Sequence, residues 1–439
     1  MLPRRPRGPR LGPSRRDWLR FIGRATVAAT LTSHACGDNL PYLAASDAVG
    51  AIVEPHSSGF TLSLWCARRT SVFVEVLHAV TGEPVVSRIG FLAANVGSHL
   101  TFTELPAATP FLVHATLHNG AEIGPFFART APPPDVAAPT RWVVAADIDI
   151  DSPHDPGIFA NMVAADVDGA FTLGDFPYCD NGPALAWSLN EYRAIHARTR
   201  AYPPIHRWLR SMPLRSIYDD HEFRNDWRPE FVQREGDRYA AAMAAWDEFF
   251  PIAGAPPEIR YRHWRWGALL EGFVLDTRRF RNNPSDPESP DKTILGKPQL
   301  AWLLNGLAQS TAKFKIVSTS VPLGFGNGID HWAGYTTERA ELMNALARMK
   351  KEGVLFISGD QHWFASHRHP NGTREAQFGA VARGPHLPPP AVDGVIARVE
   401  GLNFGVIDIQ PNLITITDHH PDGHELYREA LTAEAMRAS

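Results

Sequence analysis

The chain has 439 residues, which is too long for one ordinary core and predicts two domains. Its composition, 44% hydrophobic and 21% charged, is that of a globular protein. The formal net charge of −4 is uneven: residues 1–35 hold eight Arg and one Asp, which is +7, so the remainder carries −11. This acidic remainder excludes the basic footprint of nucleic-acid binders, and we expect no nucleic-acid partner.

Residues 1–36 predict an export signal, which we do not expect to belong to a folded domain. Ser14-Arg15-Arg16-Asp17-Trp18-Leu19 precedes a modestly apolar run and resembles the core of a twin-arginine signal. Ala35-Cys36-Gly37 resembles the end of a lipobox, which makes Cys36 a candidate lipid anchor. Ser33 departs from the aliphatic residue usual in a lipobox, so a plain signal peptide is the alternative. We expect a periplasmic, cell-surface or secreted protein that contacts the membrane only through such an anchor.

Residues 46–130 predict a small β-sandwich domain, because short stretches of alternating polarity are separated by turn residues. The alternating stretches are Gly59–Trp65, Ser71–Leu77 and Phe111–Leu117. Residues 131–139 include three consecutive prolines and predict a semi-rigid linker. Residues 140–435 predict a catalytic domain of the α/β class, because buried apolar strands alternate with helical stretches.

The α/β domain contains apolar runs typical of strands that are buried on both faces. Strands are expected at Val143–Ala146, Gly169–Leu173, Leu214–Tyr218, Gly272–Leu275, Lys315–Val317 and Val354–Ile357. Helices are expected near 157–165, 182–199, 238–249, 297–309 and 336–350. The domain should close with a β-hairpin formed by 404–409 and 413–417.

Four of these strands end in groups of side chains that can bind metal ions. The groups are Asp147 with Asp149, Asp175 with Tyr178 and Asp180, Asp219 to Glu222, and Asp360 with His362. Ligand sites in open α/β sheets lie at the carboxyl ends of the strands, so we expect the four groups to meet. Carboxylates at this density raise each other's pKa unless cations neutralise them. Mixed Asp, His and Tyr ligands suit hard or borderline ions.

The same residues carry a resemblance to the calcineurin-like metallophosphoesterases, and more closely to the PhoD-like alkaline phosphatases. Leu173-Gly174-Asp175-Phe176-Pro177-Tyr178-Cys179-Asp180 resembles the Gly-Asp-x-x-Tyr-x-Asp segment of that family. Asp219-Asp220-His221-Glu222 resembles its Asp-Asp-His-Glu segment, and Ser358-Gly359-Asp360-Gln361-His362 resembles its Gly-Asp-x-His segment. The resemblance covers roughly residues 140–417.

This resemblance implies a four-layer α/β/β/α metallophosphoesterase sandwich preceded by a small all-β sandwich domain. It implies an enzyme that hydrolyses phosphomonoesters or phosphodiesters with two or more metal ions, Fe(III) and Ca(II) being the candidates. Separately, we expect a monomer. By position, the implied metal ligands are Asp147, Asp149, Asp175, Tyr178, Asp220, Asp360 and His362. Asp175 would bridge two ions about 3.5–4 Å apart, which would activate a water for attack on phosphorus. His221 would donate a proton to the leaving oxygen.

Asp147 leaves the identity of the metals open. Iron sites of the PhoD-like family can use a cysteine at this position, and an all-oxygen site also suits Mn(II), Zn(II) or Mg(II). Tyr178 instead favours Fe(III), because a phenolate ligand prefers a trivalent ion. The division of Asp360 and His362 between the two ions also stays open. Arg278 could bind a phosphate with two hydrogen bonds, but a structural ion pair is the favoured interpretation.

Two other functions remain as alternatives. One is a non-catalytic surface protein that keeps metal ions for stability and binds a partner through its β-sandwich. The other is a phospholipase-like diesterase that acts on lipid head groups. The presence of His221 argues against the first, because a non-catalytic protein has no need of a proton donor.

Overall fold

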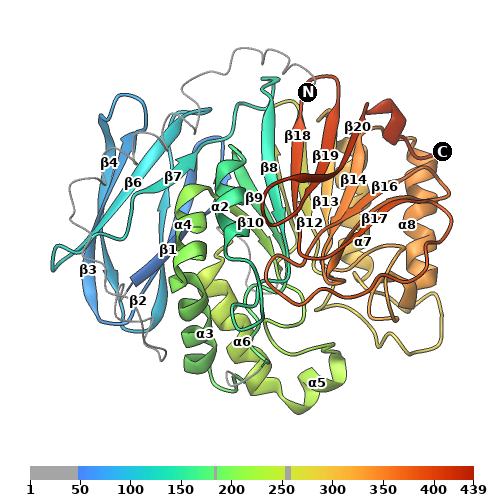
Figure 1. Cartoon of the computed structure of the whole chain (residues 1–439), viewed down its shortest axis with the longest axis horizontal. Coiled ribbons are helices and arrows are strands. Elements are labelled where there is room, and N and C mark those ends of the chain that lie inside the picture. The colour runs from blue at the N-terminus through green and yellow to red at the C-terminus, as the bar shows by residue number, and fades with distance from the viewer. Residues whose placement is uncertain (1–47, 182–184, 253–258) are drawn as a thin grey trace.

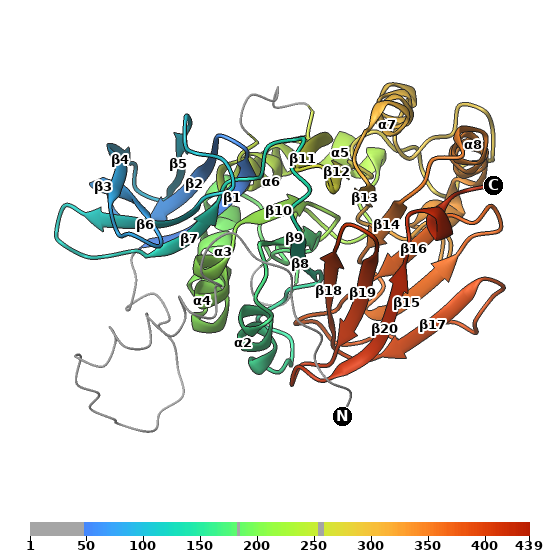
Figure 2. The same cartoon turned by 90° about the horizontal axis from the view of Figure 1, so that it is seen from above.

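The computed structural model describes residues 48–181, 185–252 and 259–439. The expected export signal and Cys36 lie outside these described residues. Two large sheets face each other, and helices cover their outer sides (Figure 1). A smaller sheet, drawn in blue and cyan, lies beside the N-terminal strands at one end of the molecule (Figure 2).

The larger sheet has nine strands within the described residues, in the order β20-β19-β18-β8-β9-β10-β1-β2-β5. Strands β8, β9 and β10 are parallel neighbours at its centre. The nine strands are β1 (Ala48–His56), β2 (Gly59–Cys66), β5 (Val96–Phe102), β8 (Thr140–Ala145), β9 (Gly169–Leu173), β10 (Leu214–Ile217), β18 (Phe404–Ile409), β19 (Ile414–His419) and β20 (Glu425–Leu431).

The facing sheet has seven strands in the described part of the chain, in the order β11-β12-β13-β14-β16-β15-β17. They are β11 (Arg262–Trp266), β12 (Leu270–Val274), β13 (Phe314–Ser318), β14 (Val354–Ser358), β15 (Trp363–Arg368), β16 (Arg374–Gln377) and β17 (Val395–Glu400). The smaller sheet consists of β3 (Thr70–His78), β4 (Pro84–Leu92), β6 (Pro110–Leu117) and β7 (Phe126–Arg129).

The helices form two groups, one on each outer side of the paired sheets (Figure 1). The first group is α2 (Gly157–Ala164), α3 (Leu189–Ala201), α4 (Pro203–Ser211), α5 (Pro229–Arg234) and α6 (Gly236–Phe249). The second group is α7 (Lys297–Gln309) and α8 (Thr336–Met349), with the short 3-10 helix η3 (Trp332–Gly334). A further short 3-10 helix, η4 (Glu434–Met436), packs Met436 in the core between the two sheets. None of the described helices combines the length and the apolar character that crossing a membrane requires.

The layering follows from the apolar runs, which are buried on both faces. In β8, Trp142 and Val144 belong to the core between the two sheets, whereas Val143 and Ala145 belong to the core under the first helix group. Leu303 of α7 and Leu342 of α8 pack in a further core on the far side of the second sheet. The four-layer α/β/β/α sandwich that the sequence predicts is therefore confirmed.

The structure adds elements to those expected, such as α4, α5, β11 and β15 to β17, and it modifies three of the expected ones. The N-terminal β-sandwich forms as expected, with β1, β2 and β5 packed on the smaller sheet around one core, but β1 also pairs with β10 at Val53 and Leu214, so its first sheet is continuous with the large sheet. The helix expected at 182–199 begins at Leu189, where the Ser188 side chain accepts a hydrogen bond from the Glu191 N–H and caps the helix. The closing hairpin has a third strand, β20, which pairs with β19.

A buried ion-pair group ties the N-terminal strands to both large sheets. Glu54 of β1 pairs with Arg215 of β10 and with Arg262 of β11, the second at 2.5 Å. Burial alone would raise the pKa of the Glu54 carboxyl, but Arg215 and Arg262 outweigh burial and lower this pKa. Only one residue pair joins β1 to β10 in register, and this group adds charged contacts between β1, β10 and β11.

We expect Glu54→Ala to lower the free energy of unfolding by about 3–5 kcal/mol, because it leaves two buried guanidinium groups without their counter-charge. Chemical denaturation of the full chain measures the loss. Glu425→Ala is the control: Glu425 pairs with Arg428 at the surface, and an exposed pair contributes about 0–1 kcal/mol.

The contribution of Glu54 to the free energy of unfolding should also depend on pH, and it should disappear at low pH. Its pKa is lowered on folding, so the stabilisation is present above the unfolded-state pKa of about 4.3 and disappears as pH falls through the folded-state pKa. Wild type and Glu54→Ala should therefore converge in stability at low pH. A stability difference that stays constant through the acid range would contradict the assignment.

Candidate metal centre

Four strand ends converge at one edge of the two facing sheets. Asp147 follows β8, Asp175 follows β9, Asp219 and Asp220 follow β10, and Asp360 and His362 follow β14. The first three strands are parallel neighbours, whereas β14 belongs to the facing sheet. The two sheets meet where the Asp360 N–H donates to Asp147 Oδ1 at 3.3 Å. We call this group of six residues the acidic centre.

The backbone at the centre takes a conformation that L-amino acids rarely adopt. The φ angles are 58° at Asp147, 56° at Asp175, 75° at Asp360 and 64° at His362. Such conformations cost free energy and cluster at functional sites. Gly379 lies so close that a Cβ there would be 2.1 Å from Asp147 Oδ2. The acidic side chains are thus held in fixed positions by a closely packed backbone.

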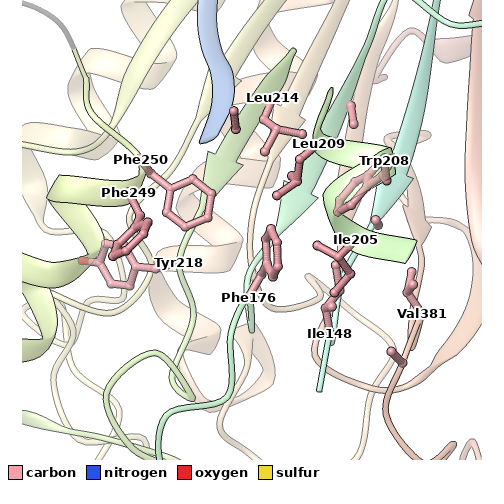
Figure 3. Packing of buried hydrophobic residues seen from close by; sticks show 14 of the residues in the cluster. Ile148, Phe176, Ile205, Trp208, Leu209, Leu214, Tyr218, Phe249, Phe250 and Val381 are labelled. Carbon is pink, nitrogen blue, oxygen red and sulfur yellow. The ribbon is translucent and has the colours of Figure 1, made fainter. Parts of the chain in front are cut away.

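Apolar neighbours anchor two of the carboxylates. Ile148 and Phe176, each one residue after a centre aspartate, point into the core under the first helix group (Figure 3). The Phe176 ring lies 5.8 Å from the rings of both Trp208 and Phe250. Because these neighbours are buried in that core, the backbone next to each aspartate is fixed, which helps to hold Asp147 and Asp175 in place.

The centre contains three overlapping sets of candidate ligands. In each set, ligand atoms from all three residues lie within 4.8 Å of one another. The sets are Asp147 with Asp175 and His362, Asp175 with Asp220 and His221, and Asp219 with Asp220 and Asp360. Asp175 belongs to the first two sets, which is the arrangement needed for a carboxylate between two adjacent cations. His362 groups with Asp147, and Asp360 groups with Asp220.

The centre holds more negative charge than its protein neighbours neutralise. Burial, together with nearby carboxylates, raises the pKa of Asp147, Asp175 and Asp360 well above the ordinary value. Asp147 Oδ2 and Asp220 Oδ1 are buried and accept no hydrogen bond. Buried polar atoms without partners are costly, so both oxygens fit a role as metal ligands. A donor set of carboxylates, imidazole and phenol suits hard or borderline cations.

Arg278 supplies part of the counter-charge. Its side chain is fully buried and binds Asp219 through Nε at 2.6 Å and Asp330 through Nη1 at 2.5 Å. Burial alone would raise the pKa of Asp220, but Arg278 and His221 outweigh burial and lower it to about 2. Arg278 is therefore a buried ion-pair residue, as the sequence favoured.

His221 is held in one orientation beside the centre. Its Nδ1 lies 2.7 Å from Asp180 Oδ1, and its ring stacks on Tyr178 with 4.1 Å between centroids. Burial lowers the pKa of His221, but Asp220 and Asp180 outweigh it and raise the pKa to about 9. Because Asp180 engages Nδ1, Nε2 is the ring nitrogen left to face the centre. The imidazolium form, which can donate a proton, is thereby favoured.

Tyr178 and His362 lie together next to Asp147, whose Oδ1 is 3.9 Å from His362 Nε2. The Tyr178 hydroxyl is 3.2 Å from His362 Nε2, and His362 Nδ1 is 2.8 Å from the carbonyl oxygen of Gly384. A carbonyl can only accept, so Nδ1 carries the hydrogen and Nε2 has a free lone pair. Burial, with Asp175 and other carboxylates, raises the pKa of the Tyr178 phenol. Tyr178 is therefore a neutral phenol unless a cation displaces its proton.

The structure places Asp149 differently from the other expected ligands. One of its oxygens, Oδ2, accepts hydrogen bonds from Arg383 Nη1 at 2.6 Å and from Asn181 Nδ2 at 2.8 Å. Its carboxylate is thus already neutralised, in contrast to that of Asp147. The Arg383 guanidinium also lies 4.8 Å from the centroid of the Tyr178 ring. Nothing in the sequence near Arg383 indicated this role.

No individual role was expected from the sequence for Asp219, Asp180 or Glu222, although each of them contacts the centre, its backbone or His221. Glu222 accepts hydrogen bonds from the N–H groups of Phe176 and Asp219, at 2.9 and 3.0 Å, and so joins the ends of β9 and β10. All three residues lie within the Gly-Asp-x-x-Tyr-x-Asp and Asp-Asp-His-Glu motifs, so the sequence did mark their positions. What the motifs could not indicate was which acids point at the centre and which hold its backbone.

Two facing sheets with outer helices and an acidic edge define the metallophosphoesterase class of fold. The fold is shared with a solved structure of PhoD, with a TM-score of 0.79 and 18% identity over 92% of this chain and 93% of that one. It is also shared with the purple acid phosphatase PPD1 from yellow lupin (Lupinus luteus), with a TM-score of 0.64 and 13% identity over 88% and 74% of the two chains.

The family model for the PhoD-like phosphatases matches residues 156–383, and the chain belongs to this family. Alkaline phosphatase D of Bacillus subtilis (strain 168) is 29% identical over 249 residues. That alignment spans 46% of this chain and 42% of the Bacillus protein, which is less than half of each. The resemblance read from the sequence is thus confirmed. Asp147 and Asp149 precede the matched segment.

Proposed function

We propose that this protein is an exported, metal-dependent phosphoesterase that hydrolyses phosphate monoesters or diesters. The observation that carries the proposal is the convergence of four strand-end segments on buried carboxylates with unpartnered oxygens, beside an oriented His221. Membership of the PhoD-like phosphatase family supports the same reaction class. The twin-arginine-like segment at Ser14–Leu19 supports export.

We assign two cation positions to the acidic centre. Asp147, Asp175, Tyr178 and His362 would hold the first cation, and Asp175, Asp220 and Asp360 would hold the second. When bound, two such ions supply Lewis acidity to a phosphate ester and lower the pKa of water. Fe(III) with Ca(II) is the pair that the family resemblance implies, and Mn(II), Zn(II) and Mg(II) fit the oxygen-rich donor set as well.

The chain's own residues would bind the ester and move the proton. His221, hydrogen-bonded to Asp180 through Nδ1, would donate a proton from Nε2 to the leaving oxygen. Asp149 would position Arg383 beside Tyr178, where the guanidinium can stabilise phosphoryl charge. Asp149 therefore acts in this proposal as a positioning residue for Arg383, which replaces the expected role as a metal ligand.

A cavity of about 320 Å³ offers a place for the alcohol part of the substrate. It adjoins the centre through Asp360 and is lined by Arg228, Asn327 and Gln361, among others. Six of its nine lining residues are polar or charged, and Ile329 is its large exposed apolar side chain. We therefore favour a polar alcohol over the acyl chains of a phospholipid, which would need a more extended apolar surface.

Metal removal tests the proposed function. The full chain is treated with a chelator and assayed with a chromogenic phosphomonoester and a chromogenic phosphodiester. We expect hydrolysis of at least one ester to be lost on chelation and restored when Fe(III), Ca(II), Mn(II), Zn(II) or Mg(II) is added back. A mock-treated sample serves as the control.

Two outcomes of this assay would contradict the proposal. Hydrolysis by protein that elemental analysis finds free of metal would exclude metal dependence. Failure to hydrolyse either ester with every metal tested would favour the non-catalytic surface protein. The ratio of monoester to diester rates identifies the substrate class.

A further inference from the structure

A group of three buried residues outside the acidic centre has the composition of a metal site. His367, His369 and Glu375 expose only 5%, 6% and 3% of their surface. Ligand atoms from all three lie within 4.8 Å of one another. None of the three takes part in the proposed reaction, so their burial together calls for a separate explanation.

The β15–β16 hairpin brings the three side chains to one face. His367 and Glu375 are directly paired across the two antiparallel strands. His369 follows His367 by two residues, so its side chain points to the same side. The neighbouring residue Ala376 belongs to the core between the two sheets, so Glu375 points toward the opposite, helix-covered side. The pairing register therefore produces this group.

The hydrogen bonds of Glu375 leave one oxygen for the histidines. Glu375 Oε1 accepts the Leu323 N–H at 2.7 Å. Oε2 lies 2.9 Å from His369 Nε2 and 4.0 Å from His367 Nδ1. Ligand atoms around a tetrahedral Zn²⁺ are about 3.3–3.5 Å apart, given metal–ligand distances of about 2.0–2.2 Å. Small side-chain adjustments would bring the three atoms to that spacing.

His367 has the arrangement expected of a metal ligand. Its Nε2 lies 3.3 Å from the carbonyl oxygen of Asp393, so Nε2 carries the hydrogen and Nδ1 has a free lone pair. Nδ1 is buried and makes no hydrogen bond, and it faces Glu375. Metal-binding histidines usually donate their second N–H to a carbonyl or carboxylate in this way. A buried nitrogen without a partner is costly unless a ligand satisfies it.

We propose that His367, His369 and Glu375 bind one Zn²⁺ at a second metal site, separate from the acidic centre. Two imidazoles and a carboxylate form a three-residue set that zinc uses in proteins. Through Leu323, the site fastens the β15–β16 hairpin to the segment that follows β13. That segment also carries Asp330, the partner of Arg278 beneath the acidic centre. The zinc ion would thus support the acidic centre through the fold.

The test counts zinc in matched variants of the full chain. Wild type, His367→Gln, His369→Gln and His420→Gln are stripped, loaded with excess Zn²⁺, desalted and measured by elemental analysis. The His420→Gln control removes an imidazole from an exposed group, formed with Asp422 and His424, that also has metal-like spacing. We expect the His367 and His369 variants to hold one Zn²⁺ per chain fewer than wild type. The His420 variant should hold the same amount as wild type.

Two further measurements keep the proposal testable if a histidine variant fails to fold. Glu375→Gln keeps an oxygen to accept the Leu323 N–H, and it should also lose one Zn²⁺ per chain. Co²⁺ loaded into wild type should give the visible bands of a tetrahedral site. Equal zinc content in wild type and all folded site variants, or the absence of tetrahedral Co²⁺ bands in wild type, would overturn the proposal.

Discussion

Asp175→Ala should lower kcat for phosphate-ester hydrolysis by about 10³-fold or more, because it removes the carboxylate shared by both proposed cation positions. Asp175 belongs to two of the three ligand sets at the centre. It also accepts the His221 N–H at 3.2 Å, so the substitution frees the backbone beside the proton donor. Steady-state kinetics with the better ester substrate, together with elemental analysis, measure the loss of rate and of metal.

Asp149→Asn is the contrasting variant. Asparagine keeps an oxygen that can accept from Arg383, and in our assignment Asp149 binds no metal. This variant should keep the metal content of wild type. Near-wild-type turnover by Asp175→Ala would remove Asp175 from the proposed centre. Loss of one metal ion from Asp149→Asn would restore Asp149 to the ligand set.

His221→Ala should lower kcat by about 10²–10⁴-fold, the usual contribution of a general acid, and should leave most of the metal bound. The loss should be smaller for esters of acidic alcohols, because a good leaving group needs less protonation. Measuring kcat across a series of esters with alcohols of different pKa tests this dependence. Loss of metal from His221→Ala would identify His221 as a ligand, and an equal loss of rate for every leaving group would exclude His221 as the proton donor.

Asp180 provides a pH test of the same role. The Asp180 carboxylate helps to raise the pKa of His221, so Asp180→Asn should lower that pKa. Catalysis that requires protonated His221 declines as pH rises through this pKa. The alkaline limb of the kcat profile should therefore move to lower pH in Asp180→Asn, whereas a structural role alone would lower kcat without moving the limb.

Local sequence was sufficient to indicate the central strands of both sheets and most of the acidic centre. A buried parallel strand is a continuous apolar run, and Gly174-Asp175 and Gly359-Asp360 mark the points where such runs end. These signals are local, because the strand and the carboxylate that follows it are adjacent in the chain. The helix expected at 297–309 matches α7, since its Pro298 near the first turn and its apolar spacing are local too.

Only the tertiary structure distinguishes the surroundings of Asp147 and Asp149. Two residues apart at the end of one strand, they look equivalent in sequence. Arg383, which comes from 234 residues further along the chain, neutralises Asp149, whereas Asp147 Oδ2 has no hydrogen-bond partner. Metal binding depends on which carboxylate lacks a counter-charge, and that is a property of long-range packing.

Strand pairing is another property that local sequence did not determine. The β-sandwich residues were recognisable from alternation, but their union with the large sheet depends on the contact between β1 and β10. His367 and Glu375 become partners only through the register of β15 and β16. Sequence alone thus determined which strands end in carboxylates and which fold class could bury them. The tertiary structure decided which distant groups face each other, because register and sheet packing bring together residues that are not neighbours in the chain.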